Sequence, residues 1–204
     1  FAFNDNQKYA YNNMNFSANW RSIFSEKLTA NFSFGYDHYD YRNDESVEEA
    51  AAARLSFAIN QWFGKVDFSY KLDNNHTLNF GLMSQFYNIN SGTYEPLHES
   101  SLVKWDQLQK DKALESAIYI GDQWEVTPKL SVNAGIRYSM FNLLGPRTYY
   151  TYQDGMLPSS TTVVDSVSVG GGKVVKTYQG PEFRLSARYA FNDDFSVKAG
   201  FNTM

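Results

Sequence analysis

Apolar and polar residues alternate along most of this chain. In the clearest run, from Leu130 to Tyr138, every even position is apolar and every odd position is polar or glycine. A period of two indicates a β-strand, whose successive side chains point to opposite faces, and no amphipathic helix produces it. The same alternation predicts eight strands, over residues 14–21, 28–37, 61–72, 78–85, 115–126, 130–139, 183–189 and 195–201.

The connections between these strands alternate in length. Four are short and polar, at residues 25–27, 73–76, 127–129 and 192–194, and each joins two strands into a hairpin. The three between the hairpins are much longer, covering residues 42–55, 91–112 and 142–182. Short turns at one end and long loops at the other are typical of a transmembrane β-barrel. We therefore predict an all-β fold, an antiparallel up-and-down meander of about eight strands with all four tight turns at one end, forming part of such a barrel. Residues 1–204 make a single partial barrel segment without a plug domain.

The alternation also predicts which face meets lipid. Val132, Ala134 and Ile136 are expected outside the barrel, with Asn133 and Arg137 inside. Replacing Ala134 by Arg near the midplane is then expected to destabilise insertion by about 2–4 kcal/mol.

The fifth strand, over residues 115–126, is the weak member of the set. Ile118, Ile120 and Trp124 share a face with Asp122. We assign this face outward, because Val126 then lies on the same side as Leu130 across the turn. The assignment places Asp122 near the membrane boundary, where a carboxylate costs much less than at the midplane.

Aromatic residues gather at both ends of the predicted strands. The turn end carries Trp20, Tyr70, Trp124 and Tyr189, and the loop end carries Tyr36, Tyr39, Tyr41, Phe86, Tyr87, Tyr138 and Phe141. Two such girdles suit the two interfaces of a membrane. The alternative is that these aromatics are ordinary strand formers in the core of a soluble sandwich.

Composition agrees with a barrel that has a wet interior. Aromatic residues make up 17% of the chain, yet the mean hydropathy is only −0.49. No stretch approaches the ~18 apolar residues that a helical span requires. The chain has no cysteine, and its net charge of −4 with interspersed signs gives no basic footprint for nucleic acid. Phe1 opens directly into polar residues rather than a signal peptide, so we expect a mature protein or a piece of one.

The search for catalytic or metal-binding chemistry returns little. His38, His76 and His98 lie far apart, and we interpret them as solvated or interfacial residues. Asp44, Glu45, Glu48 and Glu49 form an acidic run that suits a solvated loop better than calcium. Gly170–Gly172 lies between two short valine-rich runs, which indicates a hairpin inside the third long loop rather than a phosphate cradle. No Ser/His/Asp grouping is present. We predict no enzyme, no metal site and no cofactor.

Two linked hairpins carry a resemblance to a known family. The segment from Ala117 to Val126, a short turn, and then Leu130 to Tyr138 resembles the recurrent barrel hairpin of TonB-dependent outer-membrane receptors, with a Trp before the turn and Gly-X-Arg-Tyr after it. The segments 180–189 and 197–202 resemble the next hairpin of the nutrient-importing subgroup that has a carboxypeptidase-regulatory-like N-terminal domain. The resemblance covers the chain from about Met14 onward.

The resemblance implies a larger parent protein in the bacterial outer membrane. Members of the family have a 22-stranded barrel, an N-terminal plug and a TonB box, and their barrels usually end on an aromatic residue, whereas this chain ends at Met204 in apparent mid-strand. It therefore implies a piece from the middle of a barrel that imports a scarce nutrient, such as a metal chelate, glycan or peptide. The implied partners are outer-membrane lipid, the remaining strands and plug, and TonB through the parent.

Within this segment, the three long loops are expected to contribute to ligand capture. Charged residues on the inward-facing positions are expected to hydrate the lumen or hold the plug: Arg21, Lys65, Asp67, Glu115, Arg137, Arg184 and Arg188. Both terminal strands should be unpaired edges, which favour self-association. Two alternatives remain open. A complete small eight-stranded barrel with a structural or adhesive role requires residues 14–20 to pair with 195–201, and a soluble eight-stranded binding barrel requires the aromatic face to point inward.

Overall fold

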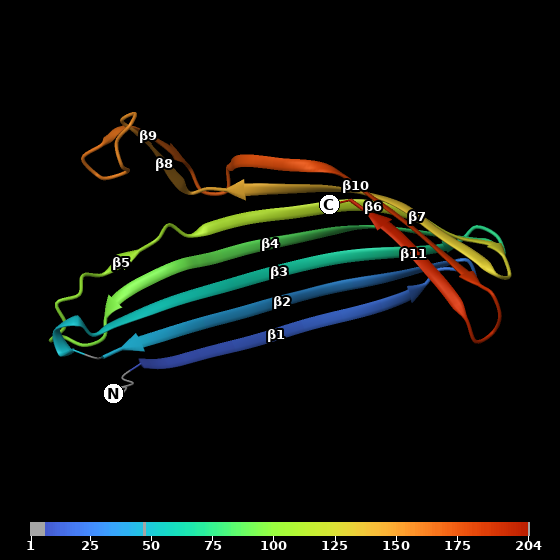
Figure 1. The fold of residues 1–204 in the computed structure, drawn as a ribbon, viewed down its shortest axis with the longest axis horizontal. Coiled ribbons are helices and arrows are strands. Elements are labelled where there is room, and N and C mark those ends of the chain that lie inside the picture. The colour runs from blue at the N-terminus through green and yellow to red at the C-terminus, as the bar shows by residue number, and fades with distance from the viewer. Residues whose placement is uncertain (1–6, 47, 204) are drawn as a thin grey trace.

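The computed structural model describes residues 7–46 and 48–203, which are almost entirely β-sheet (Figure 1). The expectations for Phe1 and Met204 lie outside the described residues. The main sheet contains β1 (Gln7–Ile23), β2 (Leu28–Glu45), β3 (Ala53–Lys71), β4 (His76–Pro96), β6 (Asp111–Thr127), β7 (Leu130–Leu144), β10 (Val174–Ala190) and β11 (Ser196–Asn202). The short β5 (Asp106–Gln107) pairs with β4, while β8 (Arg147–Tyr152) and β9 (Val163–Val169) form a separate hairpin. A single 3-10 turn, η1 (Glu49–Ala51), lies between β2 and β3.

The eight strands of the main sheet lie side by side in chain order, and every neighbouring pair is antiparallel. The four tight turns consequently lie at one end, on the right in Figure 1, and the longer connections lie at the other. The predicted meander is therefore confirmed.

All four tight turns close by the same device. The first polar residue of each turn accepts hydrogen bonds from the backbone N–H groups two and three residues later, through a side-chain oxygen. In the second turn, Asp73 Oδ1 accepts both bonds at 2.8 Å. The acceptors in the other three turns are Ser25, Thr127 and Asn192. Because these two backbone bonds stabilise its charged form, the pKa of Asp73 is held below its ordinary value.

The strands are longer, and the loops shorter, than the alternation predicted. β2 continues to Glu45 and β3 begins at Ala53, so the connection between them is shorter than the expected loop 42–55. The second loop narrows in the same way, because β4 reaches Pro96 and β6 starts at Asp111. Toward the loop end the apolar positions of β2 and β3 move to the other face, as at Tyr41 and Phe57, so the alternation read from the turn side is interrupted while the backbone ladder continues.

The third long loop is largely structured, and the hairpin expected around Gly170–Gly172 was placed wrongly. Val169 pairs with Arg147 of β8, whereas Val174 pairs with Leu144 of β7. The two flanks of the glycines therefore belong to different sheets, since each has found a partner in an earlier strand. The hairpin that does form in this loop is β8–β9.

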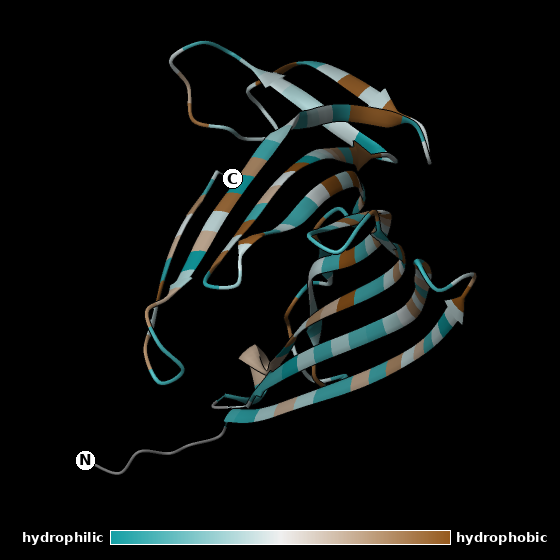
Figure 2. Cartoon of the chain, turned by 90° about the vertical axis from the view of Figure 1, so that its right-hand side faces the viewer, coloured by the Kyte–Doolittle hydropathy of each residue, from teal (hydrophilic) through white to brown (hydrophobic). Residues whose placement is uncertain are grey.

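The sheet is a single curved layer with two free edges. Figure 2 shows it curling into an open trough whose edges are β1 and β11. Among the described residues, β1 pairs only with β2 and β11 only with β10, so the ladder that a closed eight-stranded barrel requires does not form. The buried apolar side chains of the described part are five alanines: Ala30, Ala52, Ala53, Ala113 and Ala117. Because this single layer has no core of its own, its stability depends on what surrounds each face. The side chains of each face indicate which surroundings suit it.

Candidate functional site on the inner face

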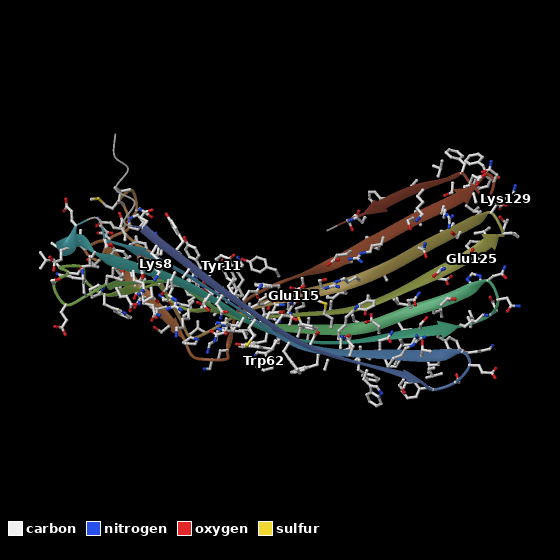
Figure 3. The ribbon with its side chains drawn as sticks, turned by 90° about the horizontal axis from the view of Figure 1, so that it is seen from below. Lys8, Tyr11, Trp62, Glu115, Glu125 and Lys129 are labelled. Atoms are coloured by element: carbon white, nitrogen blue, oxygen red, sulfur yellow. The ribbon has the colours of Figure 1, made fainter. Side chains whose placement is uncertain are left out.

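Side-chain contacts identify the inner, concave face of the trough. Tyr119 on β6 reaches over β4 to bond Asp67 on β3. Arg137 on β7 likewise passes β6 to contact Met83 of β4, with guanidinium nitrogens 3.8 and 3.9 Å from its sulfur. Side chains two strands apart converge more easily on the face toward which a sheet curves. Figure 3 shows the two faces, with Glu115 and Trp62 leaving the sheet on opposite sides.

Over the turn half of the strands, the outer, convex face carries most of the aliphatic and aromatic residues. Ile118 is 65% exposed and Leu82 is 54% exposed, although both lie in the middle of long strands. Their neighbours on this face include Phe68, Phe80, Ile120, Ile136 and Tyr138. The soluble barrel alternative required the aromatic face to point inward, and this arrangement is the reverse.

Asp122 lies on the outer face, as the sequence predicted. Its backbone is in register with Leu78 and Ala134, and its carboxylate oxygen lies 2.6 Å from Nδ1 of His76. The imidazole stacks on Trp124, with ring centroids 5.4 Å apart. The carboxylate is thus partnered at the turn end of the outer face, beside an aromatic residue suited to a membrane interface.

The turn-side aromatic girdle lies on the outer face, but the loop-side girdle was predicted only in part. Tyr36, Phe86 and Tyr138 point outward with Trp62, whose ring centroid lies 4.4 Å from that of Tyr36. The other members of the predicted girdle occupy the opposite face by strand alternation: Tyr39, Tyr41, Tyr87 and Phe141. The sequence interpretation grouped these residues by position along the strand and overlooked that adjacent positions face opposite ways.

Arg137 is the centre of an ion network on the inner face. Its guanidinium lies 3.5 Å from the carboxylate of Glu115 and 3.7 Å from that of Glu182. Ser139 accepts a 2.9 Å bond from Arg137 Nε and itself bonds Glu182. Tyr87 donates a hydrogen bond to Glu115 at 3.1 Å. The Arg137 side chain is only 18% exposed, so this charge is held by two carboxylates from the strands on either side.

A second group of polar residues lies beside this network and depends on a glycine. Asp67, Gly81 and Tyr119 share one cross-strand row, so the tyrosine ring crosses the position where Gly81 has no side chain. A Cβ at Gly81 would lie 2.5 Å from the Tyr119 hydroxyl and would also strike the carbonyl of Val66. Lys65 completes the group through a 2.9 Å ion pair with Asp67.

The seven residues predicted to face the lumen therefore divide into two sets. The structure brings together Lys65, Asp67, Glu115, Arg137 and Arg184 on the inner face. Arg21 lies in the row of Asp67 on the edge strand β1, and Arg188 lies near the last turn; both are exposed and form no ion pair within the described part of the chain.

Sequence reasoning missed several members of these groups. Glu182 was counted as the end of a loop, whereas it belongs to β10 and lies opposite Arg137. Tyr87 was assigned to the aromatic girdle, and Gly81 was not singled out. Strand alternation could have placed these residues on the inner face. Their partners could not be predicted, because they lie on other strands and the sequence does not reveal the register between strands.

The loop ends carry a separate charged pair. Arg54 binds Asp44 through two hydrogen bonds, at 2.7 and 2.9 Å. The bonded guanidinium lowers the pKa of the Asp44 carboxyl below its ordinary value. Glu49, also in the predicted acidic run, accepts a 2.8 Å bond from Ser100. Two members of the run, Asp44 and Glu49, are thus bonded to neighbouring side chains, and the described residues contain no group of three or more side chains suited to a metal ion.

Comparisons with known proteins were made for the sequence and for the fold. A family model described as "TonB dependent receptor-like, beta-barrel" matches residues 1–203. No curated protein is a significant match to the sequence. Within the described residues, no helix is long and apolar enough to cross a membrane.

Solved structures of similar fold include "Copper transporter OprC", with a TM-score of 0.70 and 10% identity over 97% of this chain and 31% of that one. The ferric-catecholate import receptor Fiu from E. coli K12, in its closed form, has a TM-score of 0.62 and 12% identity over 97% of this chain and 33% of that one. Its open form has a TM-score of 0.59 and 10% identity, over 97% and 36%. The chain spans about a third of the length of these structures.

Proposed function

Because this chain belongs to the TonB-dependent receptor-like β-barrel family, we propose that it forms part of the wall of an outer-membrane transporter that imports a scarce nutrient. We propose that this nutrient is a metal chelate, a glycan or a peptide. Barrels of this family are outer-membrane proteins of Gram-negative bacteria, and we place this chain there as well.

One observation carries the proposal: a single-layered sheet with an apolar outer face and a charged inner face. Exposed Ile118, Leu82 and Ile120 would be costly in water over so wide a surface, and lipid removes that cost. The inner face presents Lys65, Arg137 and partners that suit a hydrated passage. The two properties together are those of a barrel wall between lipid and a polar lumen.

The partners follow from the same sheet. Lipid covers the outer face, and further strands of the complete barrel pair with the free edges of β1 and β11, because unpaired backbone groups are not tolerated in a bilayer. A plug domain inside the barrel and TonB acting through the whole receptor complete the set that the family implies. The seven charged residues named above line the lumen, and the three loop regions contribute to capture of the nutrient.

The orientation can be tested by cysteine labelling, because residues 1–204 contain no cysteine and any cysteine elsewhere in the full-length protein can first be replaced by serine. Single cysteines at Gly155, in the β8–β9 connection, and at Asn74, in the second tight turn, are introduced separately into the full-length protein. A membrane-impermeant maleimide added to intact cells should label Gly155→Cys and should label Asn74→Cys only after the outer membrane is opened. Equal labelling of both in intact cells contradicts the orientation.

Transport is tested by uptake in cells that carry or lack the full-length protein. Radiolabelled metal chelates, glycans and peptides are offered at limiting concentration, with and without a protonophore. Uptake of one class that requires both the protein and the proton motive force supports the proposal. Uptake that persists at the same rate in depolarised cells contradicts it.

A further inference from the structure

The inner face contains a hollow whose floor is bare backbone. Gly121 and Gly135 lie side by side in one cross-strand row, and a Cβ built on Gly121 would lie 3.5 Å from the Cα of Gly135. With no side chain at either position, the hollow has a volume of about 620 Å³. Asn79 and Arg184 flank the two glycines in the same row, on β4 and β10. The floor is therefore flat, with a polar group at each end.

Arg184 is the cation that lines this hollow. A second hollow of about 240 Å³ shares Asn79, Gly121, Gly135 and Arg184 with the first, and adds Lys65 and Arg137. The carboxylic residue that borders the larger hollow is Asp122, whose side chain bonds His76 on the outer face. No carboxylate of the described inner face lines either hollow.

Arg184 is the least neutralised guanidinium in this lining. Its contact with Glu182 is long, at 3.8 Å, and its side chain is 66% exposed. Glu182 also serves Arg137 and Ser139, so one carboxylate is divided among three partners. By contrast, the bidentate bonds from Arg54 to Asp44 measure 2.7 and 2.9 Å. Arg184 thus retains N–H donors that can serve an incoming acceptor.

We propose that the hollow over Gly121 and Gly135 is a carboxylate-binding subsite anchored on Arg184. A guanidinium fork matches the two oxygens of a carboxylate in one plane, and the flat floor admits a planar group beside it. The amides of Asn79, Gln123 and Asn133 border the hollow and supply further donors. One weakly paired cation suits a monoanion better than a phosphate dianion. The subsite rests on the proposed function only in that the inner face must be open to the lumen.

Two sources can supply the carboxylate. It can belong to a free compound that enters the lumen, or to an acidic side chain of a polypeptide segment lodged inside the barrel. The chemistry at Arg184 is the same in both cases, and the two sources are distinguished by separate measurements on the full-length protein.

The first measurement uses 4-fluorobenzoate as a planar monoanion and 4-fluorobenzamide as its neutral isostere, followed by fluorine NMR with the full-length protein in detergent micelles. If the source is a free compound, the wild type binds the benzoate and not the benzamide, and Arg184→Gln weakens binding at least tenfold. Arg188→Gln is the matched control, since it removes a cation from the same face of the same strand outside the hollow, and it should stay within twofold of wild type.

The second measurement uses the Arg184→Lys variant and a zero-length carbodiimide, which joins the new amine to a carboxylate within reach. If the source is a polypeptide segment, mass spectrometry finds the crosslink to an acidic residue outside this chain, and the benzoate does not bind the wild type. A protein that shows no Arg184-dependent benzoate binding, and a crosslink only to Glu182, overturns the subsite. Neither readout requires transport, so a protein that imports nothing but binds the benzoate through Arg184 would refute the proposed function and leave the subsite intact.

Discussion

An arginine on the outer face tests the membrane assignment, and the structure shows where to put it. Ala134, the position first suggested by the alternation, lies directly opposite Asp122. Directly paired residues have Cβ atoms about 4.5–5.5 Å apart, and opposite charges there recover roughly 0.2–1 kcal/mol. Ala134→Arg therefore should cost less than the about 2–4 kcal/mol expected for an arginine at the midplane.

Ile136 is the better position for the full cost. It lies six residues from the start of β7, which is roughly 20 Å along the strand and roughly 15 Å of height at a tilt of about 40°, inside an apolar band about 25 Å tall. Its cross-strand neighbours on the two sides are Ile120 and Phe183, so no carboxylate lies directly opposite it. We expect Ile136→Arg to cost about 2–4 kcal/mol and Ala134→Arg about 1–3 kcal/mol.

The assay is reversible urea unfolding of the full-length protein in lipid vesicles, followed by tryptophan fluorescence. Asn133→Arg is the matched control, because it adds the same charge to the same strand on the inner face, and we expect it to cost less than about 1 kcal/mol. Adding Asp122→Ala to Ala134→Arg should remove the compensation. The reasoning fails if Ile136→Arg and Asn133→Arg cost the same, since the two faces would then meet the same solvent.

Three further predictions concern single contacts. Gly81→Ala should destabilise the folded barrel by about 1–3 kcal/mol in the same unfolding assay, because the new methyl group forces the Tyr119 ring and a backbone carbonyl apart. Lowering the pH should loosen the loop ends: the pKa of Asp44 is below its ordinary 3.8, so the stabilisation by Arg54 is complete above that value and is lost as pH falls through the lowered pKa. Hydrogen exchange at the ends of the strands measures this loss. Asp73→Ala should speed exchange of the two turn amides that its carboxylate accepts, at neutral pH and not below the lowered pKa of that carboxyl.

Each of these changes has a control in the chain. Gly180→Ala adds a methyl group where nothing lies within 4 Å, so it should leave stability unchanged. Arg54→Met should make exchange at the loop ends fast at every pH. If the exchange rate of this variant still changes at acid pH, the pH dependence belongs to a group other than Asp44. An unchanged exchange rate for Asp73→Ala at neutral pH would mean that the turn is held by its backbone alone.

The sequence was a good guide to local structure and a poor guide to partners. Alternation along 130–138 was enough to assign a strand and its two faces, because both depend only on neighbouring residues. The tight turns could be read from Ser25 and Asp73 for the same reason. The bond from Tyr119 to Asp67 could not, because it depends on the registers of β3, β4 and β6 together with the curvature of the sheet.

The loop ends escaped the sequence for a different physical reason. Asp44 and Arg54 continue the β2–β3 ladder through a stretch in which the apolar positions have moved to the other face, as at Tyr41 and Phe57, so the alternation read from the turn side no longer identifies the strand. Glu182 similarly follows a proline and looked like the end of a loop, although it pairs with Arg137. Backbone pairing there is maintained by the neighbouring strands, which a single segment does not reveal.

The strands are long enough to have two parts, a turn-side part that spans the bilayer in the proposed orientation and a loop-side part that extends beyond it. A tilted strand crosses a bilayer with about 9–11 residues, whereas β2, β3 and β4 have 18, 19 and 21. In the proposed orientation the surplus lies on the loop side, outside the bilayer, where pairs such as Arg54 with Asp44 stabilise the strands in water. Salt should therefore destabilise the loop-side part and leave the stability of the turn-side part unchanged, since screening acts on exposed charges and not on buried hydrocarbon. The loop-side ends of the strands can thus respond to ionic conditions while the turn-side part keeps its structure.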